Sequence, residues 1–155
     1  MRIARTAKIA AVAVAIPALM LATSSSASAS DRGSSLRKGQ TLYAGDYIWR
    51  LNNSGNAAVL LEMQPDGNLV EYVSIDSSPT DAGQACWATG TNGSGATHAT
   101  YQSDGNFVLY TDSGRAVWAS NTQGKSGNSV DINWRGIVYA GATAISSNNC
   151  QNWTS

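Results

Sequence analysis

Apolar positions between residues 47 and 140 either alternate with polar ones or form short runs that end at Gly, Asn, Asp or Ser. They do not recur at spacings of three and four residues, so the pattern predicts β-strands and no helix in this part of the chain. Many short strands with turn signals between them indicate a sandwich, barrel or prism of antiparallel sheets. The predicted strands are 47–52, 58–63, 68–73, 85–90, 99–102, 106–111 and 116–121, with weaker signals at 129–134 and 136–140.

Two of these segments repeat one motif. QPDGNLVEY at 64–72 and QSDGNFVLY at 102–110 share the Gln, Asp, Gly, Asn, Val and Tyr positions, and they begin 38 residues apart. Each copy is followed by a strand with a tryptophan, Trp87 in the first and Trp118 in the second. A period of roughly 20–50 residues is typical of repeated units that bury a common core. We therefore expect both tryptophans to belong to that core.

A third, divergent copy follows the second. RGIVY at 135–139 is aligned with GNLVEY, with Ile137 at the Val position and Tyr139 at the Tyr position. In this alignment the Gln, Asp and Asn positions are taken by Asp131, Asn133 and Arg135. The candidate for a third tryptophan strand is NWTS at 152–155.

The repeated motif predicts a β-hairpin, because Asp-Gly between alternating residues is a strong turn signal. After the turn, the Asn, Val and Tyr of each copy point to one face of the strand, and the residues between them point to the other. On that second face Leu69, Phe107 and Leu109 are natural core residues. Glu71 stands at the position of Leu109, so we expect the first hairpin to be more exposed there.

The outer face of each hairpin combines two amides, a carboxylate, a small aliphatic group and a phenol. A neutral polyol suits this set, because vicinal hydroxyls both donate and accept hydrogen bonds, and the carboxylate strengthens the bonds it accepts. So shallow a face predicts weak single-site binding, on the order of 1 mM, with avidity from two copies. The candidate carbohydrate-binding residues are Gln64, Asp66, Asn68, Val70, Tyr72, Gln102, Asp104, Asn106, Val108 and Tyr110.

The first residues have the pattern of a secretory signal peptide. Three basic residues lie within the first eight positions, an apolar run covers 9–21, and Ala-Ser-Ala at 27–29 forms a cleavage site. A membrane anchor is the alternative, but at about 1.5 Å per residue the run is too short for a bilayer core of about 30 Å. We expect a signal peptide over 1–29 and a single domain over 30–155, secreted to the extracellular space and not inserted in a membrane.

The charge of the chain and its cysteine content give two further expectations. Without the three basic residues of the signal peptide, seven basic residues face ten acidic ones, a net charge of −3, and no basic patch points to nucleic acid. In an exported chain, the pair Cys86 and Cys150 most simply forms a disulfide. Free thiols and a link between chains remain alternatives.

The motif Q-x-D-x-N-x-V-x-Y resembles the mannose-binding motif of the bulb-type lectin family, whose members carry the B-type lectin domain. WATGT and WASNT resemble that family's tryptophan segments, and the likeness covers roughly residues 35–140. The resemblance implies a β-prism II fold, in which three antiparallel sheets surround a pseudo-threefold axis. It also implies binding of terminal α-D-mannose without metal or other cofactor: Gln contacts O3, Asp and Asn contact O2, Tyr contacts O4, and Val covers the ring carbons.

The sequence departs from the family pattern in three places. The third motif has lost its polar residues, so two working sites are expected, and Arg135 is expected to obstruct the third. Cys86 and Cys150 do not have the spacing of the family's disulfide. Family members often exchange a C-terminal strand within a homodimer, but the ending AISSNNCQNWTS differs from that strand.

Two other function classes are weighed against a lectin. For a glycosidase, Asp66 and Asp104 are the candidate carboxylates, but their equivalent places in different repeats put them on different faces, and catalysis needs the pair within about 10 Å. A hydrolase triad around His98 has no matching nucleophile motif, and one histidine with two cysteines does not make a zinc site. The remaining alternative is a prism module, antibacterial or protein-binding, in which sugar binding is secondary or lost.

Overall fold

The computed structural model describes residues 29–74, 76–79 and 83–147, and this part of the chain contains strands and no helix. The nine strands predicted between residues 47 and 140 are present within a few residues, and four short strands are added. The strands are β1 (Ser30–Asp31), β2 (Ser35–Arg37), β3 (Thr41–Tyr43), β4 (Asp46–Leu51), β5 (Ala58–Met63), β6 (Leu69–Ser74), β7 (Gln84–Ala88), β8 (Ala96–Tyr101), β9 (Phe107–Thr111), β10 (Ala116–Ala119), β11 (Ser129–Ile132), β12 (Val138–Ala140) and β13 (Thr143–Ala144).

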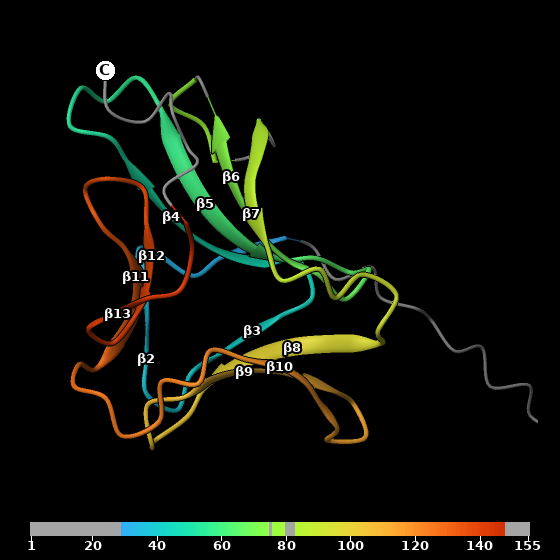
Figure 1. The fold of residues 1–155 in the computed structure, drawn as a ribbon. Helices are drawn as coiled ribbons and strands as arrows, with labels where there is room; N and C mark the ends of the chain where they lie inside the picture. Colours follow the sequence, from blue (N-terminus) through green and yellow to red (C-terminus); the bar gives the residue numbers. More distant parts are fainter. Residues whose placement is uncertain (1–28, 75, 80–82, 148–155) are drawn as a thin grey trace, which may run out of the picture.

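The strands form three sheets that surround a common centre (Figure 1). The first sheet has the order β1-β4-β5-β6-β7, the second β10-β9-β8-β3, and the third β13-β12-β11-β2. All pairings are antiparallel except that of β1 with β4. This is the predicted three-sheet prism. No helix in the described part of the chain is long and apolar enough to cross a membrane.

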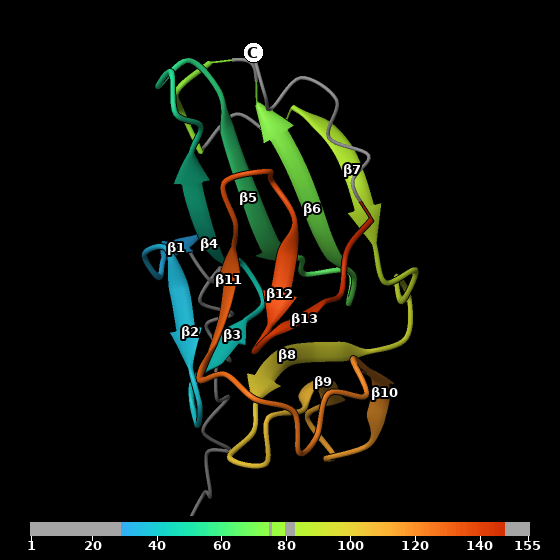
Figure 2. The same ribbon diagram turned by 60° about the vertical axis from the view of Figure 1, so that its left-hand side comes forward.

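Each sheet combines three consecutive strands of one repeat with strands from the N-terminal part of the chain, namely β4 and β1 in the first sheet, β3 in the second and β2 in the third. The early strands β2, β3 and β4 follow one another closely in sequence, yet each joins a different sheet. Figure 2 shows β2 at the edge of the third sheet, beside β11. The N-terminal segment therefore ties the three repeats together.

The core lies where the inner faces of the three sheets meet. Phe107 of β9, Leu61 of β5 and Val130 of β11 are fully buried in one cluster. Trp87 and Trp118 pack against this cluster, and their rings meet edge to face with centroids 6.0 Å apart. The prediction that both tryptophans belong to the core is confirmed.

The third repeat has no tryptophan at the corresponding place. In the first two sheets the tryptophan is paired with the residue before the last position of the motif, Trp87 with Glu71 and Trp118 with Leu109. The equivalent residue of the third hairpin is Ala140, and it is paired with Thr143 of β13. Within the described residues the strand after β12 is β13, and the candidate segment 152–155 lies outside them, so that candidate stays a prediction.

The expectation that the first hairpin is more exposed at Glu71 is wrong. Glu71 is 0% exposed, because the alternation of β6 turns it to the same inner face as Leu109 of β9. Burial raises the pKa of this carboxyl to about 7, and the nearby Ser146 hydroxyl opposes only part of the shift. Within the described residues neither carboxylate oxygen has a partner with hydrogen-bond geometry. Ser146 is thus a neighbour of Glu71 and not a full hydrogen-bond partner.

Two predictions concern residues outside the described part of the chain. Cys86 lies in β7 and packs against the core cluster, but Cys150 is outside the described residues, so the predicted disulfide stays a prediction. The same holds for the signal peptide, of which only residue 29 is described.

Candidate functional site

The two hairpins close with the same turn. The Gln64 N–H donates to the Asn68 carbonyl at 2.8 Å, and the Gly67 N–H donates to the Gln64 carbonyl at 3.1 Å. Asp66 Oδ1 accepts a hydrogen bond from the Asn68 backbone N–H at 2.9 Å. Gly67 has a φ of +91°, which L side chains rarely adopt, so this position requires glycine.

The turn of the second hairpin has the same hydrogen bonds, and their lengths agree within 0.1 Å. Gln102 donates to the Asn106 carbonyl at 2.8 Å, Gly105 donates to the Gln102 carbonyl at 3.0 Å, and Asp104 Oδ1 accepts from the Asn106 N–H at 2.9 Å. The same bonds thus hold each carboxylate in place. The other oxygen of each has no hydrogen bond within the described chain.

The predicted outer face is present in both copies, and its side chains contact one another. Gln64 Nε2 donates to the Tyr72 hydroxyl at 2.7 Å, and Gln102 Nε2 donates to the Tyr110 hydroxyl at 2.7 Å. Because each phenol oxygen accepts from an amide, its own hydrogen is left to donate to a ligand. Between the Asn and the Tyr, each valine presents a nearly buried apolar surface.

Four hydroxyl residues that the sequence interpretation missed orient the asparagines. Asn68 Oδ1 accepts from the Thr89 hydroxyl and from the Thr91 N–H, both at 3.1 Å, while the Thr91 hydroxyl donates to the Gly67 carbonyl at 2.7 Å. Since the amide oxygen is occupied by the protein, the Nδ2 group is the part left for a ligand. The second hairpin has the same bonds, from Ser120 and Thr122 to Asn106 and from Thr122 to Gly105.

A signal for these residues exists in the sequence. WATGT and WASNT both place a hydroxyl residue two and four positions after the tryptophan. Their role depends on the pairing of β7 with β6 and of β10 with β9, which brings them back beside the turn.

The third hairpin corrects the alignment made from the sequence. The Asn133 N–H donates to the Ile137 carbonyl at 2.9 Å, and the Gly136 N–H donates to the Asn133 carbonyl at 3.0 Å. Asn133, Arg135 and Ile137 therefore stand at the Gln, Asp and Asn positions, and Tyr139 stands at the Val position. The sequence alignment was wrong by two residues, because it matched the tyrosines although the turn glycine sets the register.

The Tyr position of the third hairpin is Gly141, which cannot carry a side chain. Its φ is +61°, and a Cβ built there would lie 2.4 Å from the Ser126 carbonyl oxygen. At the turn, Trp134 is 53% exposed, and the Arg135 guanidinium carbon lies 4.6 Å from the centre of its ring. Among the described residues only the first two hairpins carry the complete motif.

Solved structures with the same architecture identify the family. The mannose-specific agglutinin of snowdrop (Galanthus nivalis) bulbs, in complex with methyl-α-D-mannoside, matches with a TM-score of 0.55 and 33% identity over 71% of this chain and 90% of that chain. The monomeric monocot mannose-binding lectins of Gastrodia elata match with a TM-score of 0.53 and 33% identity over 76% and 97%. The chain belongs to the bulb-type lectin family.

A fungal structure is also similar to this bulb-type lectin. The Marasmius oreades lectin matches with a TM-score of 0.56 and 25% identity over 79% of this chain and 97% of that chain. Comparisons with protein-family models and with curated protein sequences gave no match.

The strands beside the two hairpins give this bulb-type lectin different local charges. Val70 is paired with Glu62, and burial raises the pKa of Glu62, with a smaller contribution from the charge of Asp66. Val108 is paired with the neutral Thr100. The first hairpin therefore lies beside a second carboxylate and the second hairpin does not.

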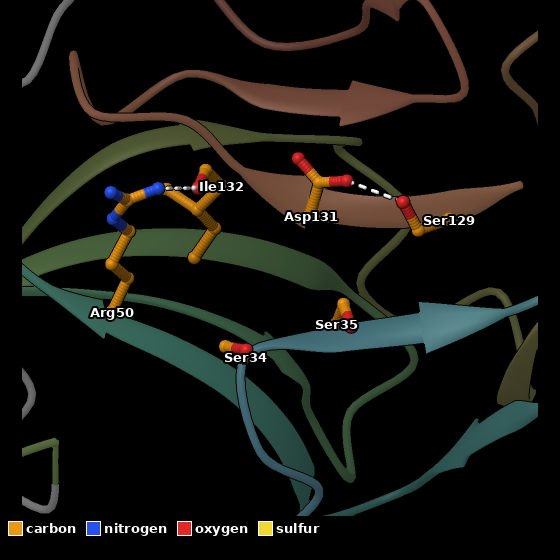
Figure 3. A pocket seen from close by; sticks show the side chains of 6 residues that line it. All are labelled: Ser34, Ser35, Arg50, Ser129, Asp131 and Ile132. Atoms are coloured by element: carbon orange, nitrogen blue, oxygen red, sulfur yellow. Dashed lines mark hydrogen bonds between the residues drawn. The ribbon is translucent and has the colours of Figure 1, made fainter. Parts of the chain in front are cut away.

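A polar pocket of about 360 Å³ lies between the first and third sheets of this bulb-type lectin, away from both hairpins (Figure 3). Its charged groups are engaged within the protein: Arg50 donates to the Ile132 carbonyl at 3.3 Å, and the Ser129 hydroxyl donates to Asp131 at 2.6 Å. The pocket contains none of the candidate carbohydrate-binding residues. No group of His, Cys, Asp or Glu in the described residues is placed to hold a metal ion.

Proposed function

We propose that this bulb-type lectin binds terminal α-D-mannose of glycans through the hairpins 64–72 and 102–110. The observation that carries the proposal is the identical arrangement of side-chain hydrogen bonds in the two hairpins, which the third hairpin does not repeat although its backbone turn is the same. Four polar side chains are held the same way twice, although the surrounding strands differ. The snowdrop agglutinin, whose structure holds methyl-α-D-mannoside, supports mannose as the sugar.

Each hairpin offers a complementary set of groups to one sugar ring. The asparagine Nδ2 donates to a hydroxyl, the uncommitted oxygen of the aspartate accepts from it, and the tyrosine hydroxyl donates to another. In the family's arrangement the first two contact O2, the tyrosine contacts O4 and the glutamine contacts O3. The valine methyl groups cover the ring carbons. None of these contacts requires a metal or a catalytic group, and Asp66 and Asp104 lie at the turns of different sheets.

Export to the extracellular space is part of the proposal and rests on the N-terminal sequence pattern. Mannose-containing glycans outside the cell are then the partners. Assembly as a homodimer is a separate matter, and size-exclusion chromatography with light scattering on the mature chain tests it directly.

Calorimetric titration with methyl α-mannoside tests the proposal. We expect a dissociation constant on the order of 1 mM and two sites per chain. Methyl α-glucoside, which differs only in the configuration at C2, should bind much more weakly, because Asp and Asn contact O2. The double variant Tyr72→Phe, Tyr110→Phe should lose binding, because it removes the O4 contact and leaves each glutamine amide without its phenol.

Tyr139→Phe is the matched control, because Tyr139 lies on the third hairpin and outside both motifs. It should bind methyl α-mannoside as the wild type does. Absence of heat with methyl α-mannoside in the folded wild type would remove mannose as the ligand. Equal binding by the double variant would remove the two hairpins as the sites.

A further inference from the structure

An aromatic row extends the second hairpin towards the edge of its sheet. Tyr110 of β9 is paired with His98 of β8, which is paired with Tyr43 of β3. The His98 ring stacks on Tyr110 with centroids 5.8 Å apart at 27°, and the Tyr43 ring lies 5.9 Å from His98 at 38°. Tyr43 is 60% exposed. The row begins at the last residue of the motif and ends at an open tyrosine.

Strand register places His98 on the outer side opposite Tyr110, and a β-bulge directly before it brings Thr97 to the same side. The pairing of β8 with β9 shifts between Ala96 and His98, so Thr97 is an extra residue and both Thr97 and His98 lie on the outer side, half-buried. Bulges of this kind re-aim a side chain and are common beside functional sites. At the same place the first sheet pairs β5 with β6 without a shift.

The hydrogen bonds of His98 fix which ring nitrogen faces a ligand. The Thr97 hydroxyl donates to Asp112 Oδ1 at 2.6 Å, so its oxygen must accept at 3.0 Å from His98 Nδ1–H. In the neutral ring the hydrogen then lies on Nδ1 and Nε2 is a free acceptor. A sugar hydroxyl placed against the ring edge can therefore donate to Nε2.

The first and third sheets have no such extension. In the first, the corresponding residues are Leu60, which is nearly buried, and Trp49, whose indole N–H donates to Asp31 of β1 at 2.9 Å. In the third, the position of Tyr110 is Gly141. The aromatic row is thus particular to the second hairpin.

We propose that Tyr43 and His98 form a second-sugar subsite beside the second hairpin, so that this site prefers an oligosaccharide to a single mannose. The inference rests on the proposed function, because Tyr110 must hold the first sugar. Two strand spacings, roughly 10 Å, separate Tyr110 from Tyr43, and the next ring of a short chain lies within that reach. The electron-rich faces of the aromatic rings pack against the C–H side of that ring, while His98 Nε2 accepts from one of its hydroxyls.

His98 supplies its own reporter, because it is the single histidine of the chain. Its imidazole NMR signals need no assignment by mutation and report the second hairpin alone. Titration of the wild type with methyl α-mannoside and with the α1,2-, α1,3- and α1,6-linked mannobioses gives the affinity of this site for one sugar and for two. We expect the best mannobiose to bind about fivefold more tightly than methyl α-mannoside, because one additional aromatic contact contributes a free energy of about this size.

Variants at Tyr43 separate the subsite from the primary site. Tyr43→Ala should reduce the preference for mannobiose to below about twofold and change the methyl α-mannoside affinity little, whereas Tyr43→Phe should keep the preference. Trp134→Ala is the matched control, because it removes another exposed aromatic, at the third turn. It should behave as the wild type does.

The outcomes distinguish the two proposals. Equal affinities for one and two sugars in the wild type, or a Tyr43→Ala variant that weakens both sugars alike, overturn the subsite and leave mannose binding intact. Calorimetric heat without any change at His98 also overturns it, because only the first hairpin then binds. No heat and no change at His98 with any of these sugars overturn the proposed function, and the subsite with it.

Discussion

Tyr72 and Tyr110 end the same motif, yet the sheets that carry them differ on both faces. On the inner face, the residue before the tyrosine is Glu71 in the first sheet and Leu109 in the second. On the outer face, the valine is paired with Glu62 in the first and with Thr100 in the second. The hydrogen bonds of the two hairpins nevertheless agree. The hairpin and the hydroxyl pair of the following strand are therefore sufficient to build the site, and the rest of each sheet can diverge.

The inner-face difference predicts the largest effect, a gain of stability in Glu71→Leu. The pKa of Glu71 is raised to about 7 from an ordinary value of 4.5. Between these two pH values the unfolded chain loses its proton while the folded protein keeps it, so the free energy of unfolding falls as pH rises through this window. The cost is complete above pH 7 and amounts to about 3 kcal/mol. Glu71→Leu should remove it.

Urea unfolding of wild type and Glu71→Leu at pH 4.5 and pH 8 measures this effect. The stability advantage of the variant should be about 3 kcal/mol larger at pH 8 than at pH 4.5. Glu71→Gln, which keeps the shape without the charge, should have the same pH profile as the leucine variant. Parallel profiles for wild type and both variants would mean that the buried carboxyl costs nothing.

Glu71 also shows where sequence interpretation reached its limit. The alternation of β6 predicted correctly that this residue shares a face with Leu69, but its charge suggested exposure. Strand geometry leaves no choice of face, because a residue between two outward side chains must point inward. The core therefore accepts a carboxyl that the sequence could not place there with residue preferences alone.

The strands β4 to β11 were predictable because each has at least four residues, enough to show a pattern, and β12, with three, was found through the divergent third copy of the motif. β2, β3 and β13 have two or three residues, too few for any periodicity to appear. The distribution of β2, β3 and β4 over three sheets depends on contacts between distant segments. The family resemblance implied three sheets but did not predict this distribution.

The candidate site was predictable where one hairpin carries it and not where a second strand contributes. The polar face of each motif follows from strand alternation, and the structure brings its members together. Thr91 and Thr122 lie 24 and 17 residues from the glycines whose carbonyls they bind, so their role depends on strand register. The third hairpin was misaligned for a similar reason, since its turn hydrogen bonds, and not its tyrosine, define the equivalent positions.

A paired substitution at these hydroxyls tests whether each site is built independently. Thr122→Val removes the bond to Gly105 and the support of the Ser120 hydroxyl, so Asn106 should lose its fixed orientation. We expect about a tenfold loss of methyl α-mannoside affinity at the second hairpin, equal to about 1.4 kcal/mol. Thr91→Val should cause a similar loss at the first hairpin. The imidazole signals of His98 measure the second site in both variants.

The two variants should therefore differ in the affinity that the His98 signals report. Thr122→Val should weaken the affinity that His98 reports, and Thr91→Val should leave it unchanged while calorimetry shows the loss of one site. A change at His98 in Thr91→Val would mean that the two hairpins are coupled through the core. Unchanged binding in both variants would mean that the hydroxyls stabilise the turn only.

The smallest effect is expected from the outer-face difference at Glu62. Burial first, and the charge of Asp66 second, raise the pKa of this carboxyl, so its ionised form destabilises the folded protein above its ordinary pKa. Glu62→Gln should therefore raise the free energy of unfolding at pH 7 and have no effect near pH 4. The gain should be only a few tenths of a kcal/mol, because this side chain is only half-buried and solvent screens its charge.

Salt separates the two causes of the raised pKa of Glu62. Raising the ionic strength to about 1 M should abolish the contribution from Asp66 and leave that from burial. A gain in Glu62→Gln that vanishes entirely in high salt would contradict that order and make repulsion by Asp66 the main cause. The second hairpin, where the neutral Thr100 holds this place, should show no such dependence on pH or salt.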